Sequence, residues 1–244
     1  MKIIGIIPAR MGSSRFPGKP LKLIKGKPMI QRVIENCEKS KLLSEVITAT
    51  CDKEIYDFVK SKNKHVLMTS KKHTRASDRV CEALKKIEKK KQKKFDIVVM
   101  IQGDEPMIKG KMIDSAVKPM LKDKRINVVN LMGPIRSNRD LLSVNTIKVI
   151  SNNKGDAIYF SRSPIPHQKK FKKNQYFKQI CVIPFKRNFL FKYSKWNETK
   201  LEKKESIDML RVLENNFNVR LVKTLTMTQA VDDLSDLKLV EKLL

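Results

Sequence analysis

Apolar runs that suit buried β-strands alternate with amphipathic stretches that suit α-helices over roughly the first 130 residues of this chain. The expected strands are residues 3–7, 46–50, 65–68, 97–101 and 128–132. The expected helices are 28–37, 53–61 behind an Asp52 cap, one preceded by Ser77 or Asp78, and 111–121. This alternation predicts an α/β fold with a mostly parallel central sheet, helices on both faces and right-handed crossovers. Ligands of such sheets bind at the carboxyl ends of the strands.

The pattern changes after residue 145, where strands and helices no longer alternate regularly. Residues 161–176 are rich in proline, lysine and glutamine and predict an extended excursion. The remaining expected elements are strands at 147–150, 157–160, 180–183 and 219–225, and helices at 188–195, 202–215 and from a Ser235 cap to Leu244. The sequence contains no internal repeat, and no flexible linker separates these two parts of the chain. We therefore expect residues 1–244 to form a single domain.

Charge and cysteine content narrow the class of protein. The 244 residues include 53 lysines and arginines against 25 acids, which gives a net charge of +28. Because lysines occur along the whole chain and aromatic residues make up only 6%, we expect no specific nucleic-acid partner. No apolar stretch is long enough to predict a membrane span or a signal peptide. The scattered cysteines form no CxxC pair, which predicts reduced thiols in a cytoplasmic protein: Cys37, Cys51, Cys81 and Cys181.

A basic segment with two glycines, residues 8–20, directly follows the first expected strand. Glycine lets backbone N–H groups approach an anion closely, and Arg10, Arg15 and Lys19 add three positive charges. The spacing matches neither G-x-x-x-x-G-K-[S/T] nor G-x-G-x-x-G. An ordinary basic surface loop is the alternative, but here strand, glycines and cations occur in the order that phosphate binding requires. We therefore expect this loop to bind a polyphosphate.

A polar cluster, residues 102–106, follows the strand expected at 97–101. Its Asp104 is placed to hold a hard cation such as Mg²⁺, with capping of the next helix as the alternative. Asp232 and Asp233 precede the last expected helix, where capping is the commoner role; paired in space with Asp104, they would complete a metal site. The histidines show no metal-ligand spacing and no catalytic companion: His65, His73 and His167. A triphosphate held beside a metal indicates nucleotidyl transfer, in which the protein mainly positions groups and neutralises charge.

Longer motifs resemble the 3-deoxy-manno-octulosonate (Kdo) cytidylyltransferase family, in the family's order, through nearly the whole chain. They are IIPARMGSSRFPGKPL at 6–21, GKPMIQRV at 26–33, IQGDEPMI at 101–108, NTIKVI at 145–150, IYFSRSPIP at 158–166, LRVL at 210–213 and VDDLSDL at 231–237. The resemblance implies a Rossmann-like nucleotide-diphospho-sugar transferase fold, usually as a homodimer. It also implies a Mg²⁺-dependent reaction in which the anomeric hydroxyl of a 2-keto-3-deoxy sugar acid attacks CTP, giving a CMP-sugar and pyrophosphate.

The same resemblance implies roles for individual residues. CTP is expected at Pro8, Ala9, Arg10, Ser13, Arg15, Lys19 and Ser77. Catalysis is expected from Arg10, Lys19 and Asp104, and Mg²⁺ binding from Asp104 and Asp232. The sugar acid is expected at Arg79, Gln102, Gln179 and Asp208. Ser161 and Arg162 fall in a further family motif, and residues 161–200 are the expected sugar-side and dimerisation insertion.

The sugar side departs from the family pattern. Gly-Thr-(Glu/Asp)-Arg is replaced by Ala76-Ser77-Asp78-Arg79, and His-x-Gly-x-Tyr by Gln179-Ile180-Cys181-Val182-Ile183. Glu-Gln before Leu-Arg becomes Asp208-Met209, and Val-Asp-Thr-Pro becomes Val231-Asp232-Asp233-Leu234. Because a site that hydrogen-bonds hydroxyls discriminates strongly, these exchanges leave the acceptor open. Kdo is the leading acceptor, and a modified sugar acid of the amino-Kdo or nonulosonic type is the close alternative. A basic, non-catalytic nucleic-acid-binding domain is the alternative outside enzymes.

Overall fold

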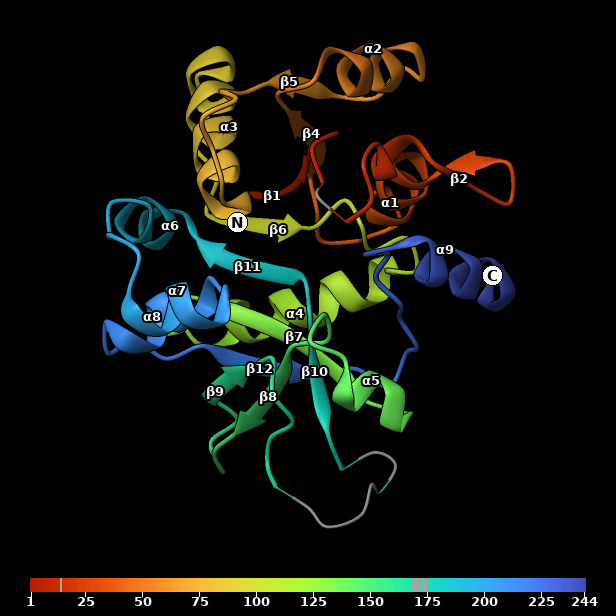
Figure 1. Ribbon diagram of the computed structural model, residues 1–244. Coiled ribbons are helices and arrows are strands. Elements are labelled where there is room, and N and C mark those ends of the chain that lie inside the picture. The colour runs from red at the N-terminus through yellow and green to blue at the C-terminus, as the bar shows by residue number, and fades with distance from the viewer. Residues whose placement is uncertain (14, 168–171, 173–174) are drawn as a thin grey trace.

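The computed structural model describes residues 1–13, 15–167, 172 and 175–244 (Figure 1). Its central sheet has the strand order β11–β6–β1–β4–β5. Four of these strands are parallel: β1 (Ile3–Ala9), β4 (Glu45–Thr50), β5 (Val66–Met68) and β6 (Ile97–Ile101). The first four strands expected from the sequence are therefore confirmed. β1 lies in the middle of the sheet and is buried along its whole length.

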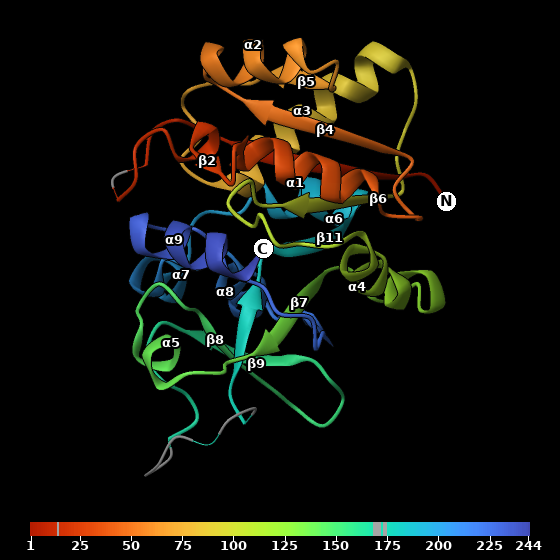
Figure 2. The same ribbon diagram turned by 90° about the vertical axis from the view of Figure 1, so that its right-hand side faces the viewer.

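Helices cover both faces of this sheet (Figures 1 and 2). They are α1 (Met29–Glu38), α2 (Lys53–Ser61), α3 (Ala76–Lys91), α4 (Gly110–Lys122) and α6 (Arg187–Tyr193). Side chains of β1 alternate between the faces: Ile4 and Ile6 pack with α3 and α6, whereas Ile3 and Ile7 pack with α1, α2 and α4. This burial on both sides explains why the strand is an almost continuous run of isoleucine.

A second sheet, with the order β12–β7–β10–β8–β9, is mostly antiparallel. Its strands are β7 (Val129–Pro134), β8 (Lys148–Ser151), β9 (Ala157–Ser161), β10 (Phe177–Ile180) and β12 (Arg220–Lys223). Only Cys181 separates β10 from β11 (Val182–Lys186), so one chain segment passes from this sheet into the central one. β11 pairs antiparallel with β6 and occupies the edge at which the parallel series would have continued. The assignment of the strand at 128–132 to the central sheet is therefore wrong, because that strand is β7.

The single helix expected at 202–215 is also wrong, because two helices, α7 (Lys200–Glu205) and α8 (Met209–Glu214), replace it. Between them Ser206 has a left-handed conformation, with φ of 55°. The carboxylate of Glu205 accepts hydrogen bonds from the Ser161 hydroxyl (2.9 Å) and the Arg162 backbone N–H (2.8 Å), both at the end of β9. The Arg162 side chain also donates to the Glu205 carbonyl oxygen (2.6 Å). These contacts hold the end of α7 against the second sheet and turn the chain.

Helix starts differ from the expected caps. Asp233 rather than Ser235 caps the last helix, α9 (Leu234–Leu243), through a side-chain bond to a backbone N–H of its first turn. Asp52 precedes α2, but its side chain makes no capping bond. α3 begins at Ala76, before both expected positions. At α2 the acid that precedes the helix has another partner, the Met11 backbone N–H, which sequence alone does not reveal.

The remaining short elements are η1 (Lys19–Leu21), β2 (Leu23–Ile24), β3 (Lys27–Pro28) and α5 (Asn138–Leu142). Within the described part of the chain, no helix has the length and apolar character needed to cross a bilayer. The excursion expected at 161–176 includes residues 168–171 and 173–174, which lie outside the described residues. The wider segment 161–200 contributes β10, β11 and α6 to the fold.

Candidate active site

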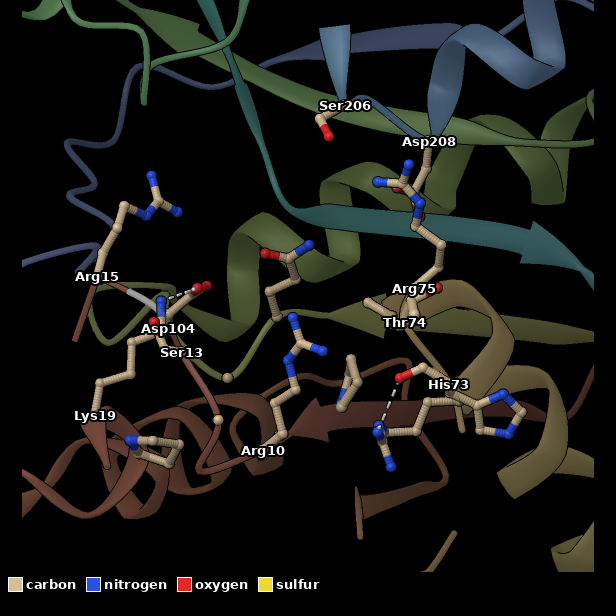
Figure 3. A pocket seen from close by; sticks show the side chains of 18 of the residues that line it. Arg10, Ser13, Arg15, Lys19, His73, Thr74, Arg75, Asp104, Ser206 and Asp208 are labelled. Carbon is tan, nitrogen blue, oxygen red and sulfur yellow. Dashed lines mark hydrogen bonds and ion pairs between the residues drawn. The ribbon is translucent and has the colours of Figure 1, made fainter. Parts of the chain in front are cut away.

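A cavity of about 370 Å³ opens at the carboxyl ends of β1 and β6, where ligands of such a sheet are expected (Figure 3). The loop after β1 forms one wall, and residues 73–76 in front of α3 form the opposite wall. Arg10 points into the cavity from the loop (Figure 3). The lining contains all the predicted CTP contacts except Ser77: Pro8, Ala9, Arg10, Ser13, Arg15 and Lys19.

The loop of residues 8–20 is anchored by a carboxylate at the end of β4. Asp52 Oδ2 accepts a hydrogen bond from the Met11 backbone N–H (2.8 Å), and the Met11 carbonyl accepts one from Gly18 N–H (3.0 Å). Gly18 has φ of 70°, a conformation that glycine adopts without steric cost. Sequence reasoning missed this role of Asp52. Its position just after the strand at 46–50, at the same carboxyl edge as the loop, was the available signal.

Two acids converge on one lysine beside this loop. Lys19 Nζ lies 2.6 Å from Asp104 Oδ2 and 3.6 Å from Asp232 Oδ1. Arg15 also contacts Asp232, at 2.8 Å. Burial and the nearby Asp104 carboxylate raise the pKa of Asp232. The fold thus brings together the two acids that sequence spacing left apart, while Asp233 caps α9 instead.

This pair of carboxylates fits a hard divalent cation. Mg²⁺ in proteins is usually bound by one or two carboxylates together with substrate phosphates. Across the described ranges, no group of three or more His, Cys, Asp or Glu side chains could hold a metal ion. Asp104 also does not cap α4, whose preceding residue is Lys109. The donor set therefore suits an ion shared with a bound phosphate rather than one enclosed by protein.

A second cavity, of about 530 Å³, adjoins the first. Arg136, Arg139, Lys178 and Gln179 line this second cavity and not the first. Arginine and lysine can hold a carboxylate, and an amide can hydrogen-bond a hydroxyl, so the lining suits a polyhydroxy acid. Both cavities are lined by Arg15, Gln102, Asp104, Arg162, Ser206 and Asp208.

The predicted sugar residues are not all in this second cavity. Gln102, Gln179 and Asp208 line it, whereas Arg79 lines only the first. Arg79 is 3% exposed, and its guanidinium donates to Thr69 Oγ1 (2.5 Å) and to a neighbouring carbonyl, which holds the segment in front of α3. Ser77 is buried, lines neither cavity and donates to Asp208 Oδ2 (3.0 Å).

Arg75 and Glu105 are site residues that sequence reasoning missed. Arg75 lines the first cavity and lies 3.8 Å from Asp208 through Nη1 (Figure 3). Glu105 lines the second cavity and is 4% exposed, and burial, with the nearby Asp104, raises its pKa to about 7. Their signals were a cation just before α3 and an acid beside Asp104. Neither was sufficient, because the direction of each side chain depends on packing.

Comparison with known proteins shows that a chain with this fold is a nucleotidyltransferase. Residues 4–225 match the family model described as cytidylyltransferase, and the chain belongs to that family. The prediction of an enzyme is therefore confirmed.

Curated relatives match over nearly their full length. The 3-deoxy-manno-octulosonate cytidylyltransferase of Geobacter metallireducens is 42% identical over 255 residues, covering 100% of this chain and 98% of the relative. The enzyme of the same name from Fusobacterium nucleatum is 38% identical over 240 residues, covering 98% of this chain and 96% of the relative. These matches confirm the resemblance seen in the motifs.

Solved structures agree with the fold. A CMP:2-keto-3-deoxy-manno-octonic acid synthetase complexed with CTP has a TM-score of 0.88 at 35% identity, covering 100% of this chain and 98% of that one. A cytidylyltransferase from Leptospira borgpetersenii shares the fold at 17% identity and a TM-score of 0.64, covering 99% of this chain and 85% of that one. The predicted Rossmann-like transferase fold is confirmed.

Proposed function

We propose that this protein transfers CMP from CTP to the anomeric hydroxyl of Kdo and releases pyrophosphate, with Mg²⁺ as the cofactor. One observation carries the proposal: Asp104 and Asp232 converge on Lys19 where the two cavities meet. CTP in the first cavity and a sugar acid in the second would place the α-phosphate beside these acids. The names of the relatives and of the CTP complex supply the substrates.

The loop after β1 would bind the triphosphate. Arg10 and Ser13 line the first cavity there together with backbone of the loop, so cations and N–H groups surround the phosphates. Lys19 would neutralise charge that develops as the phosphate bond breaks. Asp104 and Asp232 would hold Mg²⁺, which when bound would offset phosphate charge at the reacting centre.

The sugar acid would occupy the second cavity. Gln102 and Asp208, at the boundary between the cavities, would orient its hydroxyls near the reacting phosphate. Cations lining the cavity would hold its carboxylate. Because Ile183 lines this cavity where the family pattern has tyrosine, a modified sugar acid of the amino-Kdo or nonulosonic type is the second candidate acceptor.

A pyrophosphate-release screen tests the function directly. The enzyme is incubated with CTP, Mg²⁺ and a panel of 2-keto sugar acids that includes Kdo, amino-Kdo and a nonulosonic acid. We expect the highest kcat/KM with Kdo. A clear preference for another acid would transfer the proposal to that acceptor, and release with none of them would refute it.

Lys19→Ala is expected to raise the Michaelis constant for CTP at least about tenfold, because a charge-assisted contact to phosphate is lost. Steady-state kinetics at saturating Kdo measure this. Lys22→Ala removes an exposed charge just after this loop and is the matched control, expected to behave like the unmodified enzyme. Unchanged CTP affinity in Lys19→Ala would contradict a phosphate role for Lys19.

Asp52→Ala is expected to raise the Michaelis constant for CTP about tenfold, because the Met11 N–H loses a charged acceptor and the loop loses an anchor. The constant for Kdo should not change. Asp57→Ala, at an exposed position on α2, removes the same charge without touching the loop. If both variants bind CTP equally well, Asp52 does not shape the CTP site.

We also propose a cytoplasmic homodimer with no specific nucleic-acid partner. Cys37, Cys51 and Cys81 are buried free thiols, which supports a reducing compartment. Residues 161–200 are the proposed subunit contact, and light scattering of the purified protein tests the dimer. The alternative of a non-catalytic domain is wrong, because the chain belongs to an enzyme family.

A further inference from the structure

A buried asparagine on β7 forms a hydrogen bond with a side chain that lines the second cavity. Asn130 is 0% exposed. Its Nδ2 donates to the backbone carbonyl oxygens of Leu131 (2.7 Å) and Ile180 (3.1 Å), and its Oδ1 accepts from Gln179 Nε2 (2.6 Å). Gln179 lines the second cavity from β10. Asn130 itself lines neither cavity.

These contacts fix the orientation of both amides. A backbone carbonyl can only accept, so the two carbonyls require the NH₂ group of Asn130 on their side. The Asn130 oxygen must then face Gln179, and because that oxygen can also only accept, Gln179 must present its own NH₂ group to it. If either amide were reversed, two acceptors or two donors would face each other and hydrogen bonds would be lost. The packing of β7 against β10 therefore determines which end of the Gln179 amide is free.

The free end is the carbonyl oxygen Oε1. Among the residues that the structure describes, no hydrogen bond reaches this atom, and it is not among the buried side-chain atoms left without a partner. Since Gln179 lines the second cavity, Oε1 is available to a ligand there. An oxygen acceptor selects a group that donates, which in a sugar acid is a hydroxyl.

We propose that Asn130 is a positioning residue that sets acceptor specificity: it orients the Gln179 amide so that Oε1 accepts a hydrogen bond from a hydroxyl of the sugar acid. The inference rests on the proposed function, because it needs a sugar acid in the second cavity. It concerns a residue that touches no substrate and acts only through Gln179. Burying an amide here would be costly without its three hydrogen bonds, all of which are made.

A double-mutant cycle tests the inference. In Asn130→Leu the Gln179 amide is free to rotate, and we expect the Michaelis constant for Kdo to rise about tenfold. Gln179→Met removes the acceptor and should have a similar effect. The double variant should be no worse than Gln179→Met alone, because both changes remove one interaction. In Asn130→Leu, kcat and the Michaelis constant for CTP should stay within about twofold of the unmodified values.

Val128→Ala is the matched control, since Val128 is fully buried just before β7 and pairs with Phe185, whereas Gln179 pairs with Met132 at the other end of that stretch. Both Val128→Ala and Asn130→Leu should lower the stability of the fold, but Val128→Ala should leave the Michaelis constant for Kdo unchanged. If the effects of Asn130→Leu and Gln179→Met on the Michaelis constant for Kdo add in the double variant, the inference is overturned in favour of a structural role for Asn130. An equal rise of that constant in Val128→Ala would overturn it as well.

Kdo analogues with each hydroxyl in turn replaced by fluorine give a test that requires no Asn130 variant. Fluorine cannot donate, so one analogue should bind the unmodified enzyme about tenfold more weakly than Kdo. That difference should disappear in Gln179→Met. Equal discrimination by both enzymes would overturn the inference. If the unmodified enzyme does not use Kdo, the proposed function fails separately, and fluorinated analogues of the acid that it does use test Asn130 in the same way.

Discussion

Asp104→Asn is expected to lower kcat for CMP transfer by about a thousandfold or more, because it removes one of two carboxylates proposed to hold Mg²⁺ at the reacting phosphate. The structure gives a specific reason for this expectation, since Asp104 Oδ2 lies 2.6 Å from Lys19 Nζ and borders both cavities. Continuous measurement of pyrophosphate release from CTP and Kdo checks the result. Chelation of Mg²⁺ should reduce the unmodified enzyme to a similar level.

Asp233→Asn is the matched control for this change. It removes the same charge next to Asp232, but the side chain of Asp233 caps α9, and asparagine caps a helix as well as aspartate. We expect this variant to keep nearly normal kcat. Near-normal turnover by Asp104→Asn, or undiminished activity after chelation, would be incompatible with the metal assignment.

Glu202→Gln is expected to lower the free energy of unfolding by about 3–5 kcal/mol, because it leaves a buried guanidinium without its counter-charge. Glu202 is 0% exposed and accepts two hydrogen bonds from Arg211, at 2.7 and 2.6 Å. Arg211 is 3% exposed and also lies against the Tyr193 ring. This pair ties α7 to α8 across the turn that leads to Asp208, so the position of Asp208 beside the two cavities depends on it.

Urea denaturation followed by circular dichroism measures the effect. Glu198→Gln is the control, because Glu198 forms an ion pair with Arg75 at 2.9 Å but its side chain is 38% exposed. An exposed pair contributes no more than about 1 kcal/mol. Similar losses in the two variants would show that the buried pair is not a major source of stability.

The first four expected strands were confirmed because a strand that is buried on both faces leaves a local signal, an unbroken apolar run in the sequence. Runs such as residues 3–7 and 97–101 are apolar at every position except Gly5. Such a continuous apolar run is typical of an interior parallel strand, which is buried on both faces. The strand at 128–132 was expected to continue the same series. It does not, because β11, more than 50 residues later in the chain, pairs with β6 at that edge. Competition between strands for one edge cannot be seen in either strand alone.

The helix expected at 202–215 shows a similar limit. Its apolar spacing is helical throughout, and both halves are indeed helices. The chain breaks at Ser206, where Glu205 is held by Ser161 and Arg162 at the end of β9. The break gives Asp208 its place at the boundary of the two cavities, so a contact distant in sequence shapes the site.

The basic loop after β1 and Asp104 were evident as candidate site features from the order of residues, because each directly follows an apolar strand and the carboxyl ends of neighbouring parallel strands share one edge. The pairing of Asp104 with Asp232, the anchoring of the loop by Asp52 and the orientation of Gln179 by Asn130 were not. Each of these is a side-chain contact between segments that are distant in the chain, and it depends on the direction in which the side chain points. Local sequence is sufficient to identify most strands and helices and a candidate phosphate loop, whereas the partners of polar side chains emerge only when the whole chain is packed.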